Sequence, residues 1–316
     1  MSDKSDSIFR RYYSQEQFQD RFLTDPADAM DVVIPVIHTN ELWEKNLISI
    51  YREVPVNRLL IGDGGCLDDS IVVAQRFPRV QVFDHKSYVS LGYSIRKLIE
   101  AVETEWFIYL HSDVYLPDGW FDTMKRYRSQ YDWFGCPMQH TIMVEYRLVD
   151  NVRPYAGSQI GRKAAFEKGL SRIDDDYVYR QEDFIFENVV ASAGFKNGRV
   201  EDAFHYHQTL RKPSKWERKV QKVGIQTEQS REEELRTWTM QGKGIIKYLM
   251  PTSDWVISEV RTSVRRLSEL GGFDLQEFRR WTAATNPAWL PYVSKRRPLR
   301  QRVGAFLRAA RDLARG

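Results

Sequence analysis

The residues of this chain that could do chemistry gather in four short segments, and the first is His111-Ser112-Asp113. It directly follows the apolar run 106–110, so its side chains would leave the end of a strand. Carboxylate oxygens suit magnesium or manganese, and Asp113 could hold such a cation against a diphosphate leaving group. Asp113 could equally cap a turn before Pro117-Asp118-Gly119, because aspartate is a common turn residue. Both interpretations stay open at the level of this segment.

The second segment is the glycine-rich turn Gly62-Asp63-Gly64-Gly65. Its glycines would let a ligand approach the backbone closely, and the Asp63 carboxylate could accept a hydrogen bond from a nucleobase. Ordinary turn chemistry explains an aspartate in this place about as well. Asp63 therefore becomes a candidate only together with the other segments.

Two acidic residues, Glu182 and Asp183, form the third segment and precede an expected apolar helix that would end at Gly194. The helix dipole favours a carboxylate at a helix N-terminus and keeps it ionised near neutrality. Such a group suits a general base that deprotonates an acceptor hydroxyl. The alternative is that both residues only stabilise the helix.

The fourth segment, Phe204-His205-Tyr206-His207, alternates in character. On a strand, His205 and His207 would face one side, while Phe204 and Tyr206 would pack on the other. Two imidazoles near carboxylates could complete a metal site or bind a diphosphate. Packing is the competing interpretation, because single histidines are usually structural.

Four apolar runs are expected to be the strands that position these segments: residues 31–36, 57–61, 80–83 and 106–110. The run 106–110 has no polar alternation, which is typical of a strand in a parallel sheet covered on both faces. Helical spacing separates the four runs, as in residues 95–102. Alternating strands and helices predict an open α/β fold, in which ligands bind beyond the carboxyl ends of the strands.

The chain changes in character after residue 208, where 216–248 and 252–281 are rich in charge and helix formers. These segments predict a small helical appendage. The expected organisation is an N-terminal extension over 1–28, an α/β domain over 29–212, a helical appendage over 213–294 and a basic tail over 295–316.

The tail 295–316 holds eight Lys or Arg residues and one Asp, with apolar residues at helical spacing. A basic amphipathic helix of this kind fits an anionic membrane surface, and packing back on the rest of the chain is the alternative. Because the net charge of the whole chain is only +4, the remainder is slightly acidic, which argues against nucleic acid as a partner.

The cellular setting is expected from what the sequence lacks. There are two cysteines, no apolar run of membrane-spanning length and no signal-peptide pattern at the start. These features predict a cytoplasmic protein whose membrane contact, if it has one, is peripheral and on the cytoplasmic face.

In this order and spacing, the segments resemble the family 2 glycosyltransferases, whose fold is the GT-A nucleotide-sugar-binding α/β sandwich. The resemblance covers residues 31–208. It is carried by Val33-Ile34-Pro35-Val36, Leu60-Ile61-Gly62-Asp63-Gly64-Gly65, residues 92–96, His111-Ser112-Asp113, residues 157–166, Glu182-Asp183 and the strand with His205 and His207.

The resemblance implies an inverting transfer of a sugar from a nucleotide-diphosphate sugar to the hydroxyl of a glycan or lipid-linked saccharide. Asp183 would be the base, with Glu182 beside it. A divalent cation, manganese or magnesium, would be held by residues among Asp113, His207, His205 and His111. Implied contacts of the nucleotide sugar are Pro35, Asp63, Arg96, Ser112, Asp113, Gly157 and Ser158.

Two positions depart from the family pattern. His111 stands where the metal motif has its first Asp, and Gly62 stands where the base-binding pair has an Asp. The first substitution keeps open the alternative of a non-catalytic sugar-nucleotide-binding or scaffold protein. A nucleotidyltransferase is a further alternative, but it would need a glycine-rich phosphate loop where this chain has Pro35-Val36-Ile37-His38.

Overall fold

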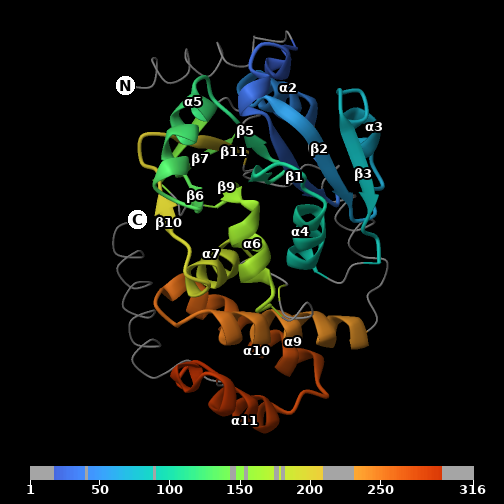
Figure 1. The fold of residues 1–316 in the computed structure, drawn as a ribbon. Coiled ribbons are helices and arrows are strands. Elements are labelled where there is room, and N and C mark those ends of the chain that lie inside the picture. The colour runs from blue at the N-terminus through green and yellow to red at the C-terminus, as the bar shows by residue number, and fades with distance from the viewer. Residues whose placement is uncertain are drawn as a thin grey trace, which may run out of the picture. The chain divides into compact units, whose positions relative to one another are not determined.

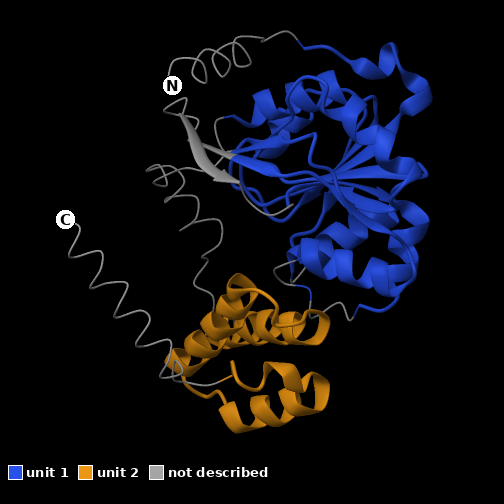
Figure 2. Ribbon diagram, turned by 90° about the vertical axis from the view of Figure 1, so that its left-hand side faces the viewer, with its two compact units in different colours: residues 1–228 blue, residues 229–316 orange. Residues whose placement is uncertain are grey.

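The computed structural model describes residues 18–39, 42–87, 90–142, 147–152, 156–173, 178, 182–208 and 231–293. The chain divides into two compact units, residues 1–228 and residues 229–316 (Figure 2). The boundary expected between 212 and 213 lies among residues 209–230, outside the described part, and the basic tail 295–316 lies outside it as well.

The first unit is built on a seven-stranded sheet of order β10-β6-β9-β4-β1-β2-β3 (Figure 1). Strands β3, β2, β1 and β4 run parallel, β9 is antiparallel to both β4 and β6, and β10 is parallel to β6. The bounds are β1 Met30–Val36, β2 Val56–Asp63, β3 Val80–Asp84, β4 Trp106–Leu110, β6 Trp133–Gly135, β9 Ser158–Arg162 and β10 Asn197–Arg199.

Helices cover both faces of this sheet (Figure 2). Alternate residues of the central strands, such as Val32, Ile34 and Ile108, share one hydrophobic core with α2 Trp43–Glu53, α3 Ser70–Ala74 and α5 Trp120–Met124. On the other face, Phe107 packs edge-on against Phe166 of α6, with ring centroids 5.6 Å apart. The helices of that face are α4 Leu91–Glu100, α6 Lys163–Leu170 and α7 Glu182–Ser192 (Figure 1).

Burial on both faces explains why the central strands β1 and β4 are almost wholly apolar. Val33, for example, is fully buried and lies in register with Leu60 of β2 and Tyr109 of β4. The predicted fold class is confirmed: a mixed α/β fold with a mostly parallel central sheet, helices on both faces and a helical C-terminal unit.

A second, four-stranded sheet of order β5-β11-β7-β8 was not expected from the sequence. Its strands are β5 Val114–Tyr115, β7 Met138–Ile142, β8 Arg147–Val152 and β11 His205–Gln208. Strand β11 pairs antiparallel with β5, so His207 lies opposite Val114, next to Asp113. Residues nearly a hundred positions apart thereby become neighbours.

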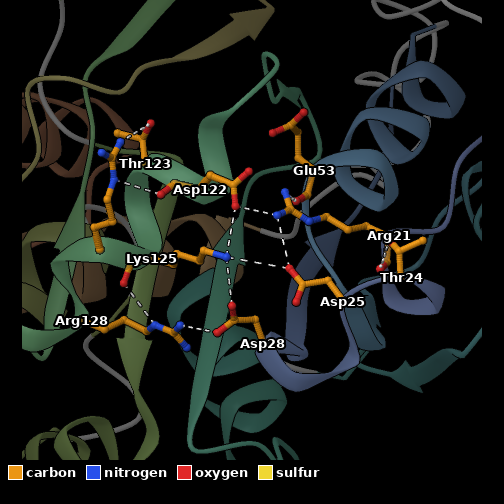
Figure 3. Close-up of polar contacts among 10 residues, drawn as sticks. Arg21, Thr24, Asp25, Asp28, Glu53, Asp122, Thr123, Lys125 and Arg128 are labelled. Atoms are coloured by element: carbon orange, nitrogen blue, oxygen red, sulfur yellow. Dashed lines mark hydrogen bonds and ion pairs between the residues drawn. The ribbon is translucent and has the colours of Figure 1, made fainter.

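The segment before β1 is held by charged groups (Figure 3). It contains two short 3-10 helices, η1 Arg21–Leu23 and η2 Pro26–Asp28. Arg21 donates hydrogen bonds to the Glu53 carbonyl of α2 at 2.8 Å and to the Asp122 carboxylate of α5 at 2.5 Å. A third 3-10 helix, η3 Lys125–Ser129, contributes Lys125 and Arg128, which both bind the Asp28 carboxylate.

The second unit is a small helical unit with its own core. Its elements are α9 Arg231–Tyr248, α10 Asp254–Leu270, α11 Leu275–Thr285 and η6 Pro287–Trp289. The fully buried Ile245, Val260, Val264 and Trp289 form the centre of that core. Within the described residues, no helix has the length and apolarity that a membrane span requires.

Candidate functional site

Three of the predicted segments meet beyond the carboxyl end of β4. His111 follows β4 directly, and its backbone N–H donates to the Gly157 carbonyl at 2.9 Å. Ser158, the first residue of β9, lies in register with Leu110, the last residue of β4. Because β9 is antiparallel to β4, the start of one strand adjoins the end of the other. This is the edge of the sheet where α/β proteins bind their ligands.

His111 points at the start of α7. Its Nε2 lies 3.5 Å from Glu182 Oε1 and 3.8 Å from Asp183 Oδ2. The Tyr109 hydroxyl donates to Glu182 Oε1 at 3.2 Å. The Glu182 and Asp183 side chains are only 8% and 7% exposed, so their charges are poorly screened by water. The sequence indicated that the two carboxylates precede the helix. In the structure they lie within the first turn of α7.

The surroundings set the protonation of this cluster. Burial, and then the charge of Glu182, raise the pKa of Asp183 above its usual range. Burial also opposes ionisation of Glu182, but the contact with His111 holds its pKa below the usual value. The same carboxylates outweigh the effect of burial on His111 and raise its pKa to about 9. With no cation bound, Glu182 and His111 are therefore a charged pair at neutral pH, and Asp183 is the carboxyl of the two that lies nearer to its titration point. His111 must lose its proton before its Nε2 can hold a cation.

A second group lies on the other side of His111. His207 Nε2 is 3.2 Å from Asp113 Oδ2, and the rings of His111 and His207 are 6.3 Å apart. Burial lowers the pKa of His207 despite the nearby Asp113, which favours the neutral, ligating form of its imidazole. Among the described residues, Asp113 Oδ1 and His111 Nε2 are buried atoms with no hydrogen-bond partner. One ligand atom from each of Asp113, His207 and His111 lies within 4.8 Å of the others.

His205 lies on the same strand but has a different environment. Its side chain is fully buried, and its Nδ1 lies 2.7 Å from the Ser158 hydroxyl, which is also fully buried. Cys136 completes this buried group, with its sulfur 3.6 Å from His205 Nδ1. Within the described chain, His205 belongs to neither group of residues whose ligand atoms could share a cation. The structure thus separates His205 from His207, which the sequence had placed in one set.

Gly157 joins the two histidine environments. Its φ is 82°, in the left-handed region that favours glycine. A Cβ on Gly157 would lie 3.4 Å from His111 Nδ1 and 3.5 Å from His205 Nε2. The backbone of Gly157 therefore lies against both rings. His205 supports this backbone through its hydrogen bond with the adjacent Ser158.

Asp63 makes the contacts of a turn residue. Its Oδ1 accepts hydrogen bonds from the N–H groups of Gly65 and Cys66 at 2.9 and 2.8 Å. Its Oδ2 lies 3.6 Å from the Lys86 ammonium. Burial raises the pKa of Asp63, but these hydrogen bonds outweigh that effect and lower it. The Asp63 carboxylate therefore stays ionised, and its Oδ1 is occupied by the hydrogen bonds within the turn.

Gly62, which stands where the glycosyltransferase pattern has an Asp, has a structural reason to be glycine. A Cβ on Gly62 would lie 2.6 Å from His85 Nδ1 and 2.9 Å from the Ser94 hydroxyl, closer than real contacts allow. His85 and Ser94 are bonded to each other across this space at 2.6 Å. His85 therefore occupies the volume that a side chain on Gly62 would need.

The other predicted donor contacts are spread more widely. Pro35 lies opposite Gly62 in the sheet, at the carboxyl end of β1. Arg96 of α4 stacks on Tyr93 and donates to the Ile173 carbonyl at 3.4 Å, and neither partner belongs to the His111 cluster. The structure thus brings Ser112, Asp113 and Gly157 to one place and sets Arg96 apart.

Helix α2 holds the segment His111-Ser112-Asp113 through polar residues that were not predicted from the sequence. The Asn46 side-chain amide donates to the Ser112 carbonyl at 2.9 Å. The Ser49 hydroxyl accepts from the Leu116 N–H at 3.1 Å and donates to the Asn46 carbonyl at 2.7 Å. Asn46 and Ser49 are fully buried and three positions apart. The available signal was two polar residues among the apolar positions Trp43, Leu47 and Ile50.

Comparisons with known proteins identify no family. No family model matches this sequence, and no curated protein does. Among solved structures, the mannosyltransferase PcManGT from Pyrobaculum calidifontis, in complex with GDP-Man and Mn²⁺, is 12% identical over 91% of this chain and 90% of that chain, with a TM-score of 0.47. TarS 1–349 from S. aureus, in complex with UDP-GlcNAc, is 13% identical over 84% and 81%, with a TM-score of 0.48.

The bifunctional IspDF from Campylobacter jejuni is 10% identical over 55% of this chain and 49% of that chain, with a TM-score of 0.39. This chain thus spans about half the length of IspDF. At these low identities and scores, no argument about activity follows from the similarity.

Proposed function

We propose that this chain is an inverting glycosyltransferase that moves a sugar from a nucleoside-diphosphate sugar to an acceptor hydroxyl. The observation that supports this most directly is the pairing of two groups across His111. On one side is the buried carboxylate pair Glu182 and Asp183, and on the other is the Asp113–His207 pair. The first suits removal of a proton, and the second suits a cation beside a phosphate group.

Asp183 is proposed as the general base. Its raised pKa makes it a stronger proton acceptor than an ordinary carboxylate, and a base works best near the operating pH. In a single displacement, the acceptor oxygen attacks the anomeric carbon and gives its proton to Asp183. The bond between that carbon and the diphosphate oxygen breaks, and the nucleoside diphosphate leaves. Glu182 would hold the cluster in place through Tyr109 and His111.

The residues around Asp113 fit a divalent cation, because Asp113 Oδ1 and His111 Nε2 are buried without hydrogen-bond partners in the described chain. Asp113, His207 and His111 would hold it. When bound, manganese or magnesium would neutralise charge on the leaving diphosphate. Because magnesium strongly prefers oxygen ligands, the two imidazoles favour manganese.

The nucleotide sugar is proposed to lie along the carboxyl ends of β1, β2 and β4. Pro35, Asp63, Ser112 and Gly157 lie at or just beyond these ends and would contact it directly. Ser158, which is buried against His205, would support the contact made by the adjacent Gly157. Arg96 of α4, which lies apart from the His111 cluster, would contact a different part of the donor. A glycan or a lipid-linked saccharide is the proposed acceptor.

The decisive test removes the base. Asp183→Asn is expected to lower kcat for transfer by about 10²- to 10⁴-fold while nucleotide-sugar binding is retained. Glu187→Gln on the same helix, where Glu187 lies 3.9 Å from Arg199, is the matched control. Transfer and binding would be followed with a panel of nucleotide sugars, with and without manganese. Full transfer activity in Asp183→Asn would sink the proposal.

One observation favours a second candidate, a sugar-nucleotide-binding protein without turnover. His111, in place of an aspartate, lies between the two groups and contacts both carboxylates of α7. That protein would show manganese-dependent nucleotide binding, abolished by Asp113→Asn, and no transfer with any acceptor.

The membrane role of the tail 295–316 stays a prediction, and tail deletion should weaken binding to anionic vesicles.

A further inference from the structure

His111 belongs to two groups of candidate ligands at once. The first contains Asp113 and His207, and the second contains Glu182 and Asp183. In each group, one ligand atom per residue lies within 4.8 Å of the others. Glu182 and Asp183 have no proposed part in holding the leaving group, so their geometry around His111 needs its own explanation.

Two adjacent buried carboxylates require a positive partner. Like charges in a poorly hydrated site repel strongly, and removing them from water is costly unless a counter-charge lies close. His111 is near enough to serve, yet its Nε2 is 3.5 and 3.8 Å from the carboxylate oxygens, beyond good hydrogen-bond length. The spacing leaves the carboxylates without close donors from His111.

A second observation points into the same space. Asp183 Oδ1 is buried and has no hydrogen-bond partner in the described chain, and its side chain is 93% buried. The other oxygen of this carboxylate, Oδ2, lies 3.8 Å from His111 Nε2, which also has no hydrogen-bond partner there. A carboxylate with an acceptor oxygen to spare and an imidazole nitrogen without a partner are two of the ligands that manganese binds.

We propose that His111, Glu182 and Asp183 form a second divalent-cation position, and that it competes with the Asp113–His207 position for His111 Nε2. One nitrogen can bind only one cation, so both positions cannot be filled with their full ligand sets. A cation on Asp183 also prevents it from accepting a proton. The second position is therefore inhibitory, and this consequence, unlike cation binding itself, rests on the proposed function.

The test measures Mn²⁺ binding to the full chain without nucleotide, from the electron paramagnetic resonance signal of free Mn²⁺. Asp113→Asn combined with His207→Gln removes the first position and is expected to keep one Mn²⁺ site. Adding Glu182→Gln should then raise the Kd of that site at least about tenfold. Adding Glu187→Gln in its place is the control and should leave the Kd unchanged.

Two results would overturn the inference. One is a folded Asp113→Asn/His207→Gln protein that binds no Mn²⁺, and the other is an unchanged Kd on adding Glu182→Gln. Thermal unfolding establishes that each variant is folded. If the Asp113→Asn/His207→Gln variant does not fold, the single variant Asp113→Asn replaces it as the background for Glu182→Gln. Binding of nucleoside diphosphates to the wild type is measured in parallel. Mn²⁺ at the carboxylates without nucleotide binding would support this inference and reject the proposed function.

The inhibitory consequence has its own readout. With saturating donor, the transfer rate should rise with Mn²⁺ and then fall over the range in which the second position fills. A rate that stays constant across that range would reject the inhibitory role.

Discussion

At the scale of single residues, Gly62 shows how a side chain elsewhere fixes the identity of a position. Gly62→Ala should lower the free energy of unfolding by about 1–3 kcal/mol, because the new Cβ would meet the buried His85 ring at 2.6 Å. Urea denaturation of the variant measures the loss.

A double-mutant cycle supplies the control for this prediction. His85→Ala alone loses packing and the bond to Ser94, but combined with Gly62→Ala it also removes the clash. The double variant should therefore lose less stability than the sum of the two single variants. Additive losses would show that His85 does not determine the glycine.

The sequence indicated which residues gather at the site better than it indicated their roles. Asp113, His111 and Asp183 could be placed because each adjoins the end of an expected element. Asp63 and His205 could not be assigned, since a carboxylate bonded to its own turn and an imidazole buried against Ser158 look the same in sequence as ligand-binding residues. The role of His205 depends on a partner that is distant in the chain, and the role of Asp63 depends on the conformation of its own turn.

At the scale of elements, α2 acts on the site without contributing a ligand. Asn46→Ala removes the hydrogen bond to the Ser112 carbonyl, which fixes the backbone beside Asp113. We expect the Kd for Mn²⁺ to rise about tenfold, with a smaller effect on thermal stability. Mn²⁺ titration and thermal unfolding of the same samples check this.

Asn57→Ala is the matched control for α2. Asn57 also donates from its side chain, at 2.8 Å, but to Asp31 at the far end of the sheet. This variant should change stability without changing the Kd for Mn²⁺. Equal effects of both variants on the Kd would mean that Asn46 has only a general structural role.

The strands of the parallel sheet could be predicted because a strand buried on both faces, such as 106–110, is apolar at successive positions. The start of α2 could not be predicted. Thr39 precedes this helix but bonds the Ser70 hydroxyl at 2.6 Å, and the helix begins only at Trp43. The antiparallel insertion of β9 and the pairing of β11 with β5 also escaped prediction, because non-local strand pairing leaves no local pattern.

At the scale of the whole molecule, the buried Glu53 makes stability depend on pH. Burial raises the pKa of Glu53 to about 7, and one carboxylate oxygen has no hydrogen-bond partner in the described chain. The folded state therefore holds this proton more tightly than the unfolded state, whose pKa is near 4.5. As pH rises from about 4.5 to 7, Glu53 should reduce the free energy of unfolding by up to about 3 kcal/mol.

Urea denaturation between pH 5 and 8 measures this dependence. Glu53→Gln should flatten the decline, because the amide keeps the shape and never ionises. Glu44→Gln, at an exposed position of the same helix, should leave the decline intact. An identical pH profile for Glu53→Gln and wild type would contradict the assignment.

The charged contacts before β1 also determine where the chain can be shortened. Residue 29 is the obvious starting point for a recombinant fragment, since the first apolar strand follows it. Such a fragment would lose Asp20, whose carboxylate binds the Arg79 guanidinium through two hydrogen bonds of 2.9 and 2.7 Å. It would also lose Asp28 and leave Lys125 and Arg128 without that shared partner. A fragment intended for crystallisation or assay should therefore begin ahead of Phe18.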